Sequence, residues 1–289
     1  FQNNPRQRCM HLNLAVRRVP RWLRRLPVDL VLFHTTFLSV RWNPPCFEQL
    51  LKKAEMLRSL GRARVAMPQD EYVYTSVVDR FIRDFNITHV YSTAPESQWS
   101  RIYPNVDRDR VVFRQTLTGY LDPDVVREID RRSRATADRP IHIGYRAKRV
   151  PFWLGEHGRL KVAIAERVRE AAGRLGLDVD ISTREEDTLY GEAWIEFLLA
   201  CRCTIGVEGG ASVLDSDGSI RARTQAYLER NPGASFEQVR EACFAEEDGR
   251  FNLRAISPRH LEACAARTCQ ILIEGDYNGV LKPYADYIP

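Results

Sequence analysis

Residues 203–207 form a short apolar segment that ends in small and acidic residues, a combination that could bind an anion. Glu208 follows the segment directly, and then come Gly209, Gly210 and Ser212. Glycine lets a backbone approach a ligand closely and adopt positive φ, and the amide groups of such a turn suit a pyrophosphate. A Gly-Gly turn is also common in α/β proteins, so it indicates phosphate binding only weakly. The sequence contains neither a P-loop nor a G-x-G-x-x-G pattern, which disfavours P-loop enzymes and ordinary NAD enzymes.

Polar side chains also follow the predicted strands of the first half, where they could act in acid–base chemistry. His34, Asp70, Glu71 and Glu96 all stand where an apolar segment ends. The adjacent pair Asp70 and Glu71 is the preferred base region, because crowding and partial burial raise the pKa of a carboxyl group. For any one of these residues, a structural role such as a loop acid that caps a helix is the more common explanation. As a set, they predict an edge of the first half at which acid–base catalysis could take place.

The elements that must position these residues alternate between strand and helix almost throughout the chain. Apolar, β-branched segments predict strands, and the segments between them predict helices. The predicted strands are residues 10–16, 28–36, 62–68, 87–93, 110–116, 141–146, 177–183, 203–208 and 269–275. The predicted helices are residues 20–26, 46–60, 73–85, 96–102, 122–134, 158–175, 190–201 and 257–267, with a charged helical section at 219–245. This alternation predicts the α/β fold class, with ligands at the carboxyl ends of the strands.

A polar, small-residue stretch that ends in proline, RSRATADRP at 132–140, separates two such series. At 289 residues the chain is long enough for two domains. We therefore predict two Rossmann-like, doubly wound domains that face a cleft. The predicted divisions are an N-terminal domain at 1–135, a linker at 136–140, and a C-terminal domain at 141–289 with a helical insert at 213–254.

The composition disfavours several classes of ligand. The cysteines number 7 and lie mostly in apolar segments without zinc spacing, so we expect reduced thiols and no metal. Residues 1–27 are rich in arginine and contain no acid, whereas the whole chain has 43 basic and 38 acidic residues. A nucleic-acid-binding protein usually spreads its basic residues along a face, so we expect no nucleic-acid partner.

Targeting signals are also missing from the sequence. The first residues, FQNNPRQRC, contain no signal-peptide-like apolar segment, and no apolar run approaches the ~20 residues that span a bilayer. We therefore expect a cytoplasmic protein. Because the sequence begins with Phe1 rather than Met, we also expect it to be trimmed.

The most specific pattern is ISPRHLEACAARTCQILIEGDYNG at 256–279. Ser257 can cap a helix that starts at Pro258, and this helix carries charged residues and then a small-residue face before an apolar strand. The stretch resembles the nucleotide-sugar-binding segment of GT-B glycosyltransferases, in which a Ser/Pro-led helix carries an acid that grips the donor's ribose. Glu262 matches that acid by position.

A second stretch, GYRAK…WLGEHGRLK at 144–161, is similar to the loop and helix that open the donor domain in bacterial surface-polysaccharide glycosyltransferases. The resemblance covers about residues 141–289, whereas residues 1–135 match only in architecture. The position eight residues before Glu262, where retaining members carry a second acid, is Arg254. Retention or inversion at the sugar therefore stays open.

The resemblance implies a metal-independent glycosyltransferase of polysaccharide biosynthesis that moves a sugar from a nucleotide-sugar donor to a glycan or lipid-linked acceptor. Glu262 would bind ribose, and Arg146 and Arg259 would pair with donor phosphates; a solvated helix acid and surface salt bridges are the ordinary alternatives. The donor-binding residues expected are Tyr145, Arg146, Lys148, Glu208, Gly209, Gly210, Ser212, Ser257, Arg259, His260, Glu262, Asn278 and Gly279. Two other functions remain open: a GT-B-fold nucleotide-sugar epimerase, and a non-catalytic nucleotide- or glycan-binding protein.

Residues 17–26 have arginines on one helical face and Val19, Trp22, Leu23 and Leu26 on the other. A basic amphipathic helix of this kind could touch anionic lipid on the inner face of a membrane. Packing of the apolar stripe on the first sheet is the more common role, and we expect it to be the main one. The sequence does not indicate an oligomeric state.

Overall fold

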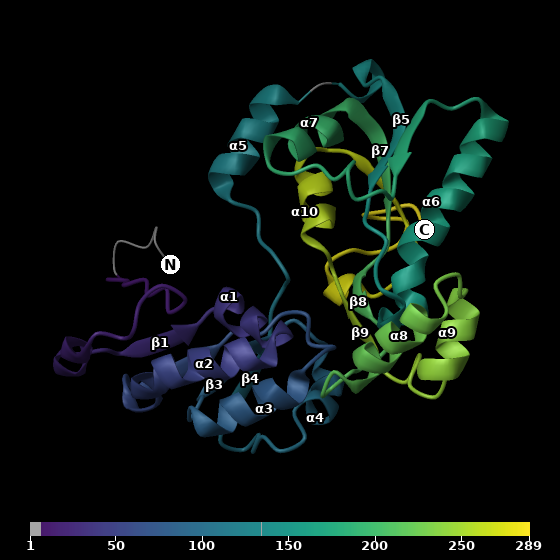
Figure 1. Ribbon diagram of the computed structural model, residues 1–289. Helices are drawn as coiled ribbons and strands as arrows, with labels where there is room; N and C mark the ends of the chain where they lie inside the picture. The colour runs from purple at the N-terminus through teal and green to yellow at the C-terminus, as the bar shows by residue number, and fades with distance from the viewer. Residues whose placement is uncertain (1–6, 134) are drawn as a thin grey trace.

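The computed structural model describes residues 7–133 and 135–289 and contains two parallel β-sheets flanked by helices (Figure 1). A short antiparallel ladder, β8 (Gly209–Ala211) with β9 (Leu253–Ala255), forms a third, two-stranded sheet. The fold class is therefore α/β, as the alternation of the sequence predicts.

The first sheet has its strands in sequence order. They are β1 (Leu30–Phe33), β2 (Ala63–Ala66), β3 (His89–Ser92) and β4 (Val112–Gln115), all parallel. Its helices are α1 (Thr35–Leu38), α2 (Pro44–Ala54), α3 (Thr75–Asp84) and α4 (Trp99–Ile102), with the 3₁₀ helices η1 (Arg21–Arg25), η2 (Ser39–Trp42), η3 (Glu55–Ser59) and η4 (Glu96–Gln98). This order lacks the reversal that defines a doubly wound sheet, so that prediction is wrong for the first half. The alternating pattern does not specify strand order, because order depends on where each crossover packs.

The second sheet contains the reversal. Its strands β5 (Ile141–Arg146), β6 (Val179–Ser182), β7 (Cys201–Gly206) and β10 (Cys269–Leu272) lie in the order β10-β7-β5-β6. Its helices are α5 (Pro123–Arg132), α6 (Glu156–Leu175), α7 (Glu192–Ala200) and α10 (Pro258–Ala265), with the 3₁₀ helices η5 (Thr136–Asp138), η6 (Phe152–Leu154) and η7 (Tyr277–Gly279). Because β5 pairs with both β6 and β7, the chain changes direction across the sheet at β5. Such a reversal leaves a crevice at the carboxyl ends of the two central strands.

The division between the halves differs from the predicted one. The sequence placed helix 122–134 in the first domain, whereas α5 lies beside α7 of the second half (Figure 1). Ile129 of α5 is buried with Trp194 and Phe197 of α7. Arg139, inside the predicted linker 136–140, is buried and donates hydrogen bonds to the carbonyls of Cys201 (2.9 Å) and Ala266 (2.8 Å). The chain therefore crosses to the second half before α5. The polar stretch after α5 is attached to the second sheet through the hydrogen bonds of Arg139.

The N-terminal segment is not a strand, contrary to the prediction for residues 10–16. The backbone turns at Asn13, whose side chain accepts a hydrogen bond from the Ala15 amide at 3.0 Å. In the predicted basic amphipathic helix, only residues 21–25 are helical. Val19 and Leu23 pack into the first core, whereas Trp22 and Leu26 are exposed. Packing thus uses Val19 and Leu23, and leaves Trp22 and Leu26 on the surface. Membrane contact stays a hypothesis.

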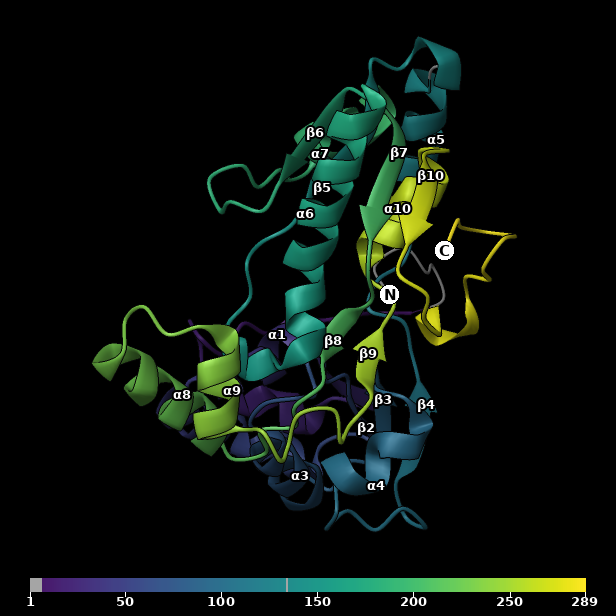
Figure 2. The same cartoon turned by 90° about the vertical axis from the view of Figure 1, so that its right-hand side faces the viewer.

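The insert at 213–254 contains α8 (Ser219–Arg230) and α9 (Phe236–Cys243) and lies against both halves (Figure 2). Val73 of the first half shares a buried cluster with Trp153 and Phe236. The Asp215 amide donates to the Tyr72 carbonyl at 2.8 Å, and the Tyr74 amide donates to the Asp215 carbonyl at 2.9 Å. The insert therefore joins the edge of the first half to the second half.

Candidate functional site

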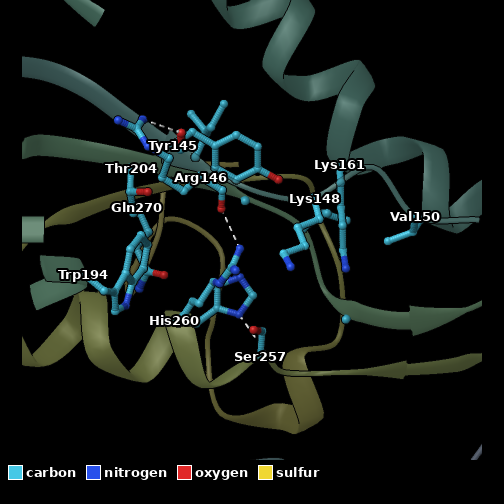
Figure 3. A pocket seen from close by; sticks show the side chains of 15 residues that line it. Tyr145, Arg146, Lys148, Val150, Lys161, Trp194, Thr204, Ser257, His260 and Gln270 are labelled. Carbon is cyan, nitrogen blue, oxygen red and sulfur yellow. Dashed lines mark hydrogen bonds between the residues drawn. The ribbon is translucent and has the colours of Figure 1, made fainter. Parts of the chain in front are cut away.

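A cavity of about 320 Å³ lies at the carboxyl ends of β5 and β7, where the second sheet reverses direction. Its size falls within the range of small-molecule sites. It is lined by Tyr145, Arg146, Lys148, Val150, Lys161, Trp194, Thr204, Ile205, Gly206, Val207, Gly209, Ser257, Arg259, His260 and Gln270. The residues come from strand ends, α6, α7 and α10, so the fold gathers distant segments at one point (Figure 3).

The cavity is rich in positive charge. Arg146, Lys148, Lys161 and Arg259 line it, and among the described residues its lining contains no aspartate or glutamate. Figure 3 shows Lys148 and Lys161 reaching into the same space. Burial lowers the pKa of Lys161, and the nearby Arg259 lowers it further. The excess of cations favours an anionic ligand, because a ligand with negative charge would remove their mutual repulsion.

Two of these cations already have partners on the rim of the cavity. Arg146 donates to the Asp180 carboxylate at 2.7 Å and lies over the Phe197 ring at 4.3 Å. Lys148 donates to Glu185 at 2.9 Å. The Lys161 ammonium, by contrast, has no hydrogen bond or ion pair with any other residue in the described parts of the chain. Lys161 is therefore the cation most available to a ligand.

His260 has a defined tautomer at the base of the cavity. The Ser257 amide donates to its Nδ1 at 3.2 Å, so the proton of the neutral ring must be on Nε2 (Figure 3). Burial, with Arg259 and Lys161 nearby, lowers the pKa of His260 to about 4. A Cβ atom at Gly206 would lie 3.1 Å from Nε2, which explains why β7 ends in glycine here. His260 is thus a neutral hydrogen-bond donor near neutral pH.

Glu262, which we expected to bind ribose, does not line the cavity. Its Oε2 accepts a hydrogen bond from Trp194 Nε1 at 2.7 Å. Arg259 lies 5.5 Å from the centre of the same indole ring, and its Nη1 donates to the Arg146 carbonyl at 2.5 Å. In this structure Glu262 therefore orients a lining residue, Trp194, and the ribose role implied by the resemblance stays a prediction.

We expected the Gly209-Gly210 sequence to form a turn. Instead, it is part of strand β8. Gly210 has a φ of 103°, and a Cβ atom there would lie 2.0 Å from the Leu253 carbonyl oxygen. The object that comes close to this glycine is thus the protein's own strand β9. Gly209 lines the cavity, whereas Gly210 does not.

Four other predicted donor-binding residues lie outside the cavity lining. Glu208 accepts a hydrogen bond from the Tyr277 amide at 2.8 Å, and burial raises its pKa. Ser212 donates to Asp248 at 2.6 Å, and Asn278 accepts from the Ile256 amide at 2.6 Å. Gly279, with a φ of 69°, belongs to the 3₁₀ helix after β10. The contacts of Glu208, Ser212 and Asn278 stabilise the loops that border the site.

The candidate catalytic residues of the first half differ in burial and in hydrogen-bond partners. Glu71 is buried and accepts hydrogen bonds from Ser92, Tyr103, Thr93 and the Ala94 amide, which occupy both of its oxygens. Burial raises the pKa of Glu71, although these hydrogen bonds act in the opposite direction and lower it. His34 is exposed, and its Nδ1 accepts a hydrogen bond from the Thr36 amide at 3.2 Å. Glu96 is exposed in the first turn of η4. Glu71 is therefore part of the structural framework of the first half.

Asp70 differs from these three residues. It is exposed, and its negative charge acts on Lys161 across the seam between the halves, where it raises the pKa of Lys161 against the larger effect of burial. The preference for the Asp70–Glu71 region thus separates into an exposed carboxylate, Asp70, and a buried one within the core, Glu71.

Sequence reasoning missed four polar or aromatic residues of the cavity, namely Lys161, Trp194, Thr204 and Gln270. Lys161 stands in the segment 144–161 that carried the second resemblance, three residues into the helix after Gly158, so position alone could have indicated it. Trp194 and Gln270 lie within apolar elements that predict core packing, and only the fold shows that they border a cavity.

Within residues 7–133 and 135–289, no three His, Cys, Asp or Glu side chains gather as metal ligands would. In the same residues, every helix is too short or too polar to cross a bilayer. No protein-family model, curated protein or solved structure matches this chain.

Proposed function

We propose that this chain is a glycosyltransferase that binds the diphosphate of a nucleotide-sugar in the cavity of its second half. The observation that carries the proposal is the position and charge of that cavity. It lies where a doubly wound sheet reverses direction, the usual place for ligands in such sheets, and cations line it without any carboxylate among the described residues.

The proposed chemistry is displacement of the diphosphate from the anomeric carbon by an acceptor hydroxyl. The hydroxyl oxygen forms the new bond to carbon, the carbon–oxygen bond to the diphosphate breaks, and the diphosphate leaves with the electron pair. Lys161 and Arg259 would stabilise the negative charge that develops on the leaving diphosphate, and His260 Nε2–H would donate a hydrogen bond. The acceptor, a glycan or lipid-linked glycan, would bind at the strand ends of the first half, where the exposed Asp70 is the best-placed proton acceptor.

A binding screen tests the donor part of this proposal. Purified protein is titrated with UDP, GDP, dTDP and CDP and with one sugar conjugate of each, and the melting temperature is recorded. A ligand at a hundred times its Kd should stabilise the fold by about 2.7 kcal/mol. If none of these compounds raises the melting temperature or binds in calorimetry, the proposal is wrong.

Product analysis separates transfer from epimerisation. The conjugate selected by the screen is incubated with protein, without acceptor, and its sugar is identified. Release of free nucleoside diphosphate only when a glycan acceptor is added supports a transferase. Conversion of the donor sugar to its epimer without acceptor would support the epimerase instead, and binding with no turnover would support a non-catalytic protein.

A further inference from the structure

Two cysteines stand opposite each other in the second sheet. Strands β7 and β10 are parallel neighbours, and their register pairs Cys203 with Cys269. Neighbouring strands lie about 4.8 Å apart, and disulfides join Cα atoms that are about 4.4–6.8 Å apart, so the pair is at bonding range. In the ladders of the described strands, no other two cysteines are paired in this way. The sheet register therefore places these two thiols together.

The side chains of the pair lie on the same face of the sheet. Successive side chains of a strand point to opposite faces, so Cys269 shares its face with Ile271. Cys203 and Ile271 both pack into the core cluster that α6 covers. Gln270 points to the other face, where its Nε2 donates to Cys264 Sγ of α10 at 3.2 Å. Cys264 is thus across the sheet from Cys269, although it is close to Cys269 in the sequence.

The two thiols differ in accessibility and acidity. Cys269 is exposed, whereas Cys203 is partly buried. Burial, with Cys269 beside it, raises the pKa of the Cys203 thiol to about 11. Packing as a small apolar residue explains Cys203, but it does not explain an exposed cysteine at its partner position. Because an accessible thiol reacts first in disulfide exchange, a reagent would meet Cys269 before Cys203.

We propose that Cys203 and Cys269 are a redox-active dithiol that a small disulfide, such as oxidised glutathione, converts to an intramolecular disulfide. The Cys269 thiolate attacks one sulfur of the small disulfide, a mixed disulfide forms, and a small thiolate leaves. The Cys203 thiolate then attacks the Cys269 sulfur, and the other small thiolate leaves. The protein thiols lose their protons to solvent and are oxidised, and the small disulfide is reduced to its thiols. This inference does not depend on the proposed function.

The strands that the disulfide would join also line the cavity. Thr204 and Gln270 directly follow the two cysteines, are paired in the same register, and both belong to the cavity lining. Strand β10 is at the edge of its sheet. The disulfide would therefore attach an edge strand to its neighbour one residue before the cavity, without occupying the cavity itself.

Peptide mapping after oxidation tests the pairing. The folded full chain is incubated in glutathione buffers of rising oxidised fraction and quenched with acid. The remaining thiols are alkylated, and tryptic peptides are analysed by mass spectrometry. Cleavage after Arg202 and Arg267 leaves Cys203 and Cys269 in the separate peptides 203–221 and 268–289, neither of which has another cysteine. We expect these peptides to be joined by a link that dithiothreitol removes.

Cys46 is the matched control, because it is exposed and lies in helix α2 without a paired cysteine in a strand ladder. It should carry glutathione alone. Absence of the link between 203–221 and 268–289 in a buffer that fully modifies Cys46 would overturn the inference. A link from Cys269 to Cys264 in place of Cys203 would overturn it as well.

Two variants test the order of the steps. Cys203→Ser removes the second thiol, so the glutathione adduct on Cys269 should accumulate to about ten-fold or more above its wild-type level. Equal adduct in the two proteins would show that the Cys203 thiol does not reach Cys269. In Cys269→Ser, oxidation of Cys203 should become much slower. If Cys203→Ser does not fold, this second variant decides, and oxidation of Cys203 at the wild-type rate would contradict the proposal.

Unfolded protein shows whether the register is the cause. The same oxidation is carried out in concentrated urea, where the long segment between the two cysteines is free. The yield of the linked peptides should fall by about ten-fold or more relative to the folded chain, because the strands no longer hold the thiols together. An equal yield in urea would mean that the link reflects thiol reactivity and not the position of the pair in the sheet.

Discussion

The two sheets of this protein arise from similar sequence patterns but use charged side chains in opposite ways. In the first half, the buried Glu71 and Arg41 have their hydrogen-bonding groups occupied by neighbouring parts of the same half. In the second half, Lys161 and Arg259 lie with other cations around a cavity, and among the described residues no carboxylate joins them in its lining. Charge that the chain satisfies itself stabilises the fold, whereas charge gathered with like charge is available to a ligand.

The largest expected effect tests the first half of this comparison. Glu71→Ala should lower the free energy of unfolding by about 3–5 kcal/mol, because it leaves several buried donors without an acceptor. Urea denaturation measures the change. The matched control is Glu96→Ala, an exposed acid of the same half, which should change stability by less than about 0.5 kcal/mol. Similar losses in both variants would remove the distinction between a structural and a surface carboxylate.

Acid should weaken the second half through its buried histidines. Burial is the main reason that the pKa values of His157 and His260 fall to about 4 from 6.5. In this pH range the unfolded chain binds more protons than the folded one, so the stability present above pH 6.5 is lost as pH falls toward about 4. For one ring the loss corresponds to about 3 kcal/mol.

The variant His260→Asn isolates one of these contributions, because its Oδ1 can replace Nδ1 as acceptor of the Ser257 amide. Urea denaturation from pH 7 to pH 4 should show a smaller loss of stability in this variant than in the wild type. An identical pH dependence in the two proteins would mean that His260 does not titrate as described.

Removal of one cation tests the second half directly. Lys161→Met should weaken binding of a nucleoside diphosphate by roughly 10- to 100-fold, since a hydrogen bond to a charged group is lost. Stability should not fall, because the ammonium has no partner of its own in the described residues and its burial is unfavourable. Calorimetry and urea denaturation measure the two effects, with Lys52→Met as the control. A loss of stability without a change in binding would show that Lys161, like Glu71, has a structural role.

The smallest expected effect concerns Glu262. Glu262→Gln keeps an acceptor for Trp194 Nε1, so the affinity for nucleoside diphosphate should stay within about two-fold. Glu262→Ala releases Trp194 and should weaken binding more. A loss of ten-fold or more in the glutamine variant would instead favour the direct ribose contact that the resemblance implies.

Much of the local structure follows from the sequence. Strand β5 has the predicted bounds, and helices such as α3 and α6 lie within two residues of their predicted starts. These elements depend on apolar periodicity and on capping residues, which act over a few positions along the chain. The segment 10–16 is the exception, because the Asn13 side chain makes a local turn that competes with a strand.

The candidate site could be predicted only in part. Tyr145, Arg146, Lys148, Ser257, Arg259 and His260 were found because they follow strands or begin a helix, and all of them line the cavity. Glu262 and Glu71 were also found by position, but their orientation depends on Trp194 and Tyr103, which are far away in the sequence. A position at a strand end thus predicts the neighbourhood of a residue and not the direction of its side chain.

The sequence by itself determined that this protein alternates strands and helices and that polar groups collect at the strand ends. Only the tertiary structure decided that the strand order of the second sheet reverses and that of the first does not. It also decided that Gly210 is needed for the close approach of strand β9, and that Lys161 of α6 and Arg259 of α10 line one cavity. The physical reason is range: periodicity and capping act between near neighbours, whereas strand order, burial and charge proximity depend on contacts between segments many residues apart.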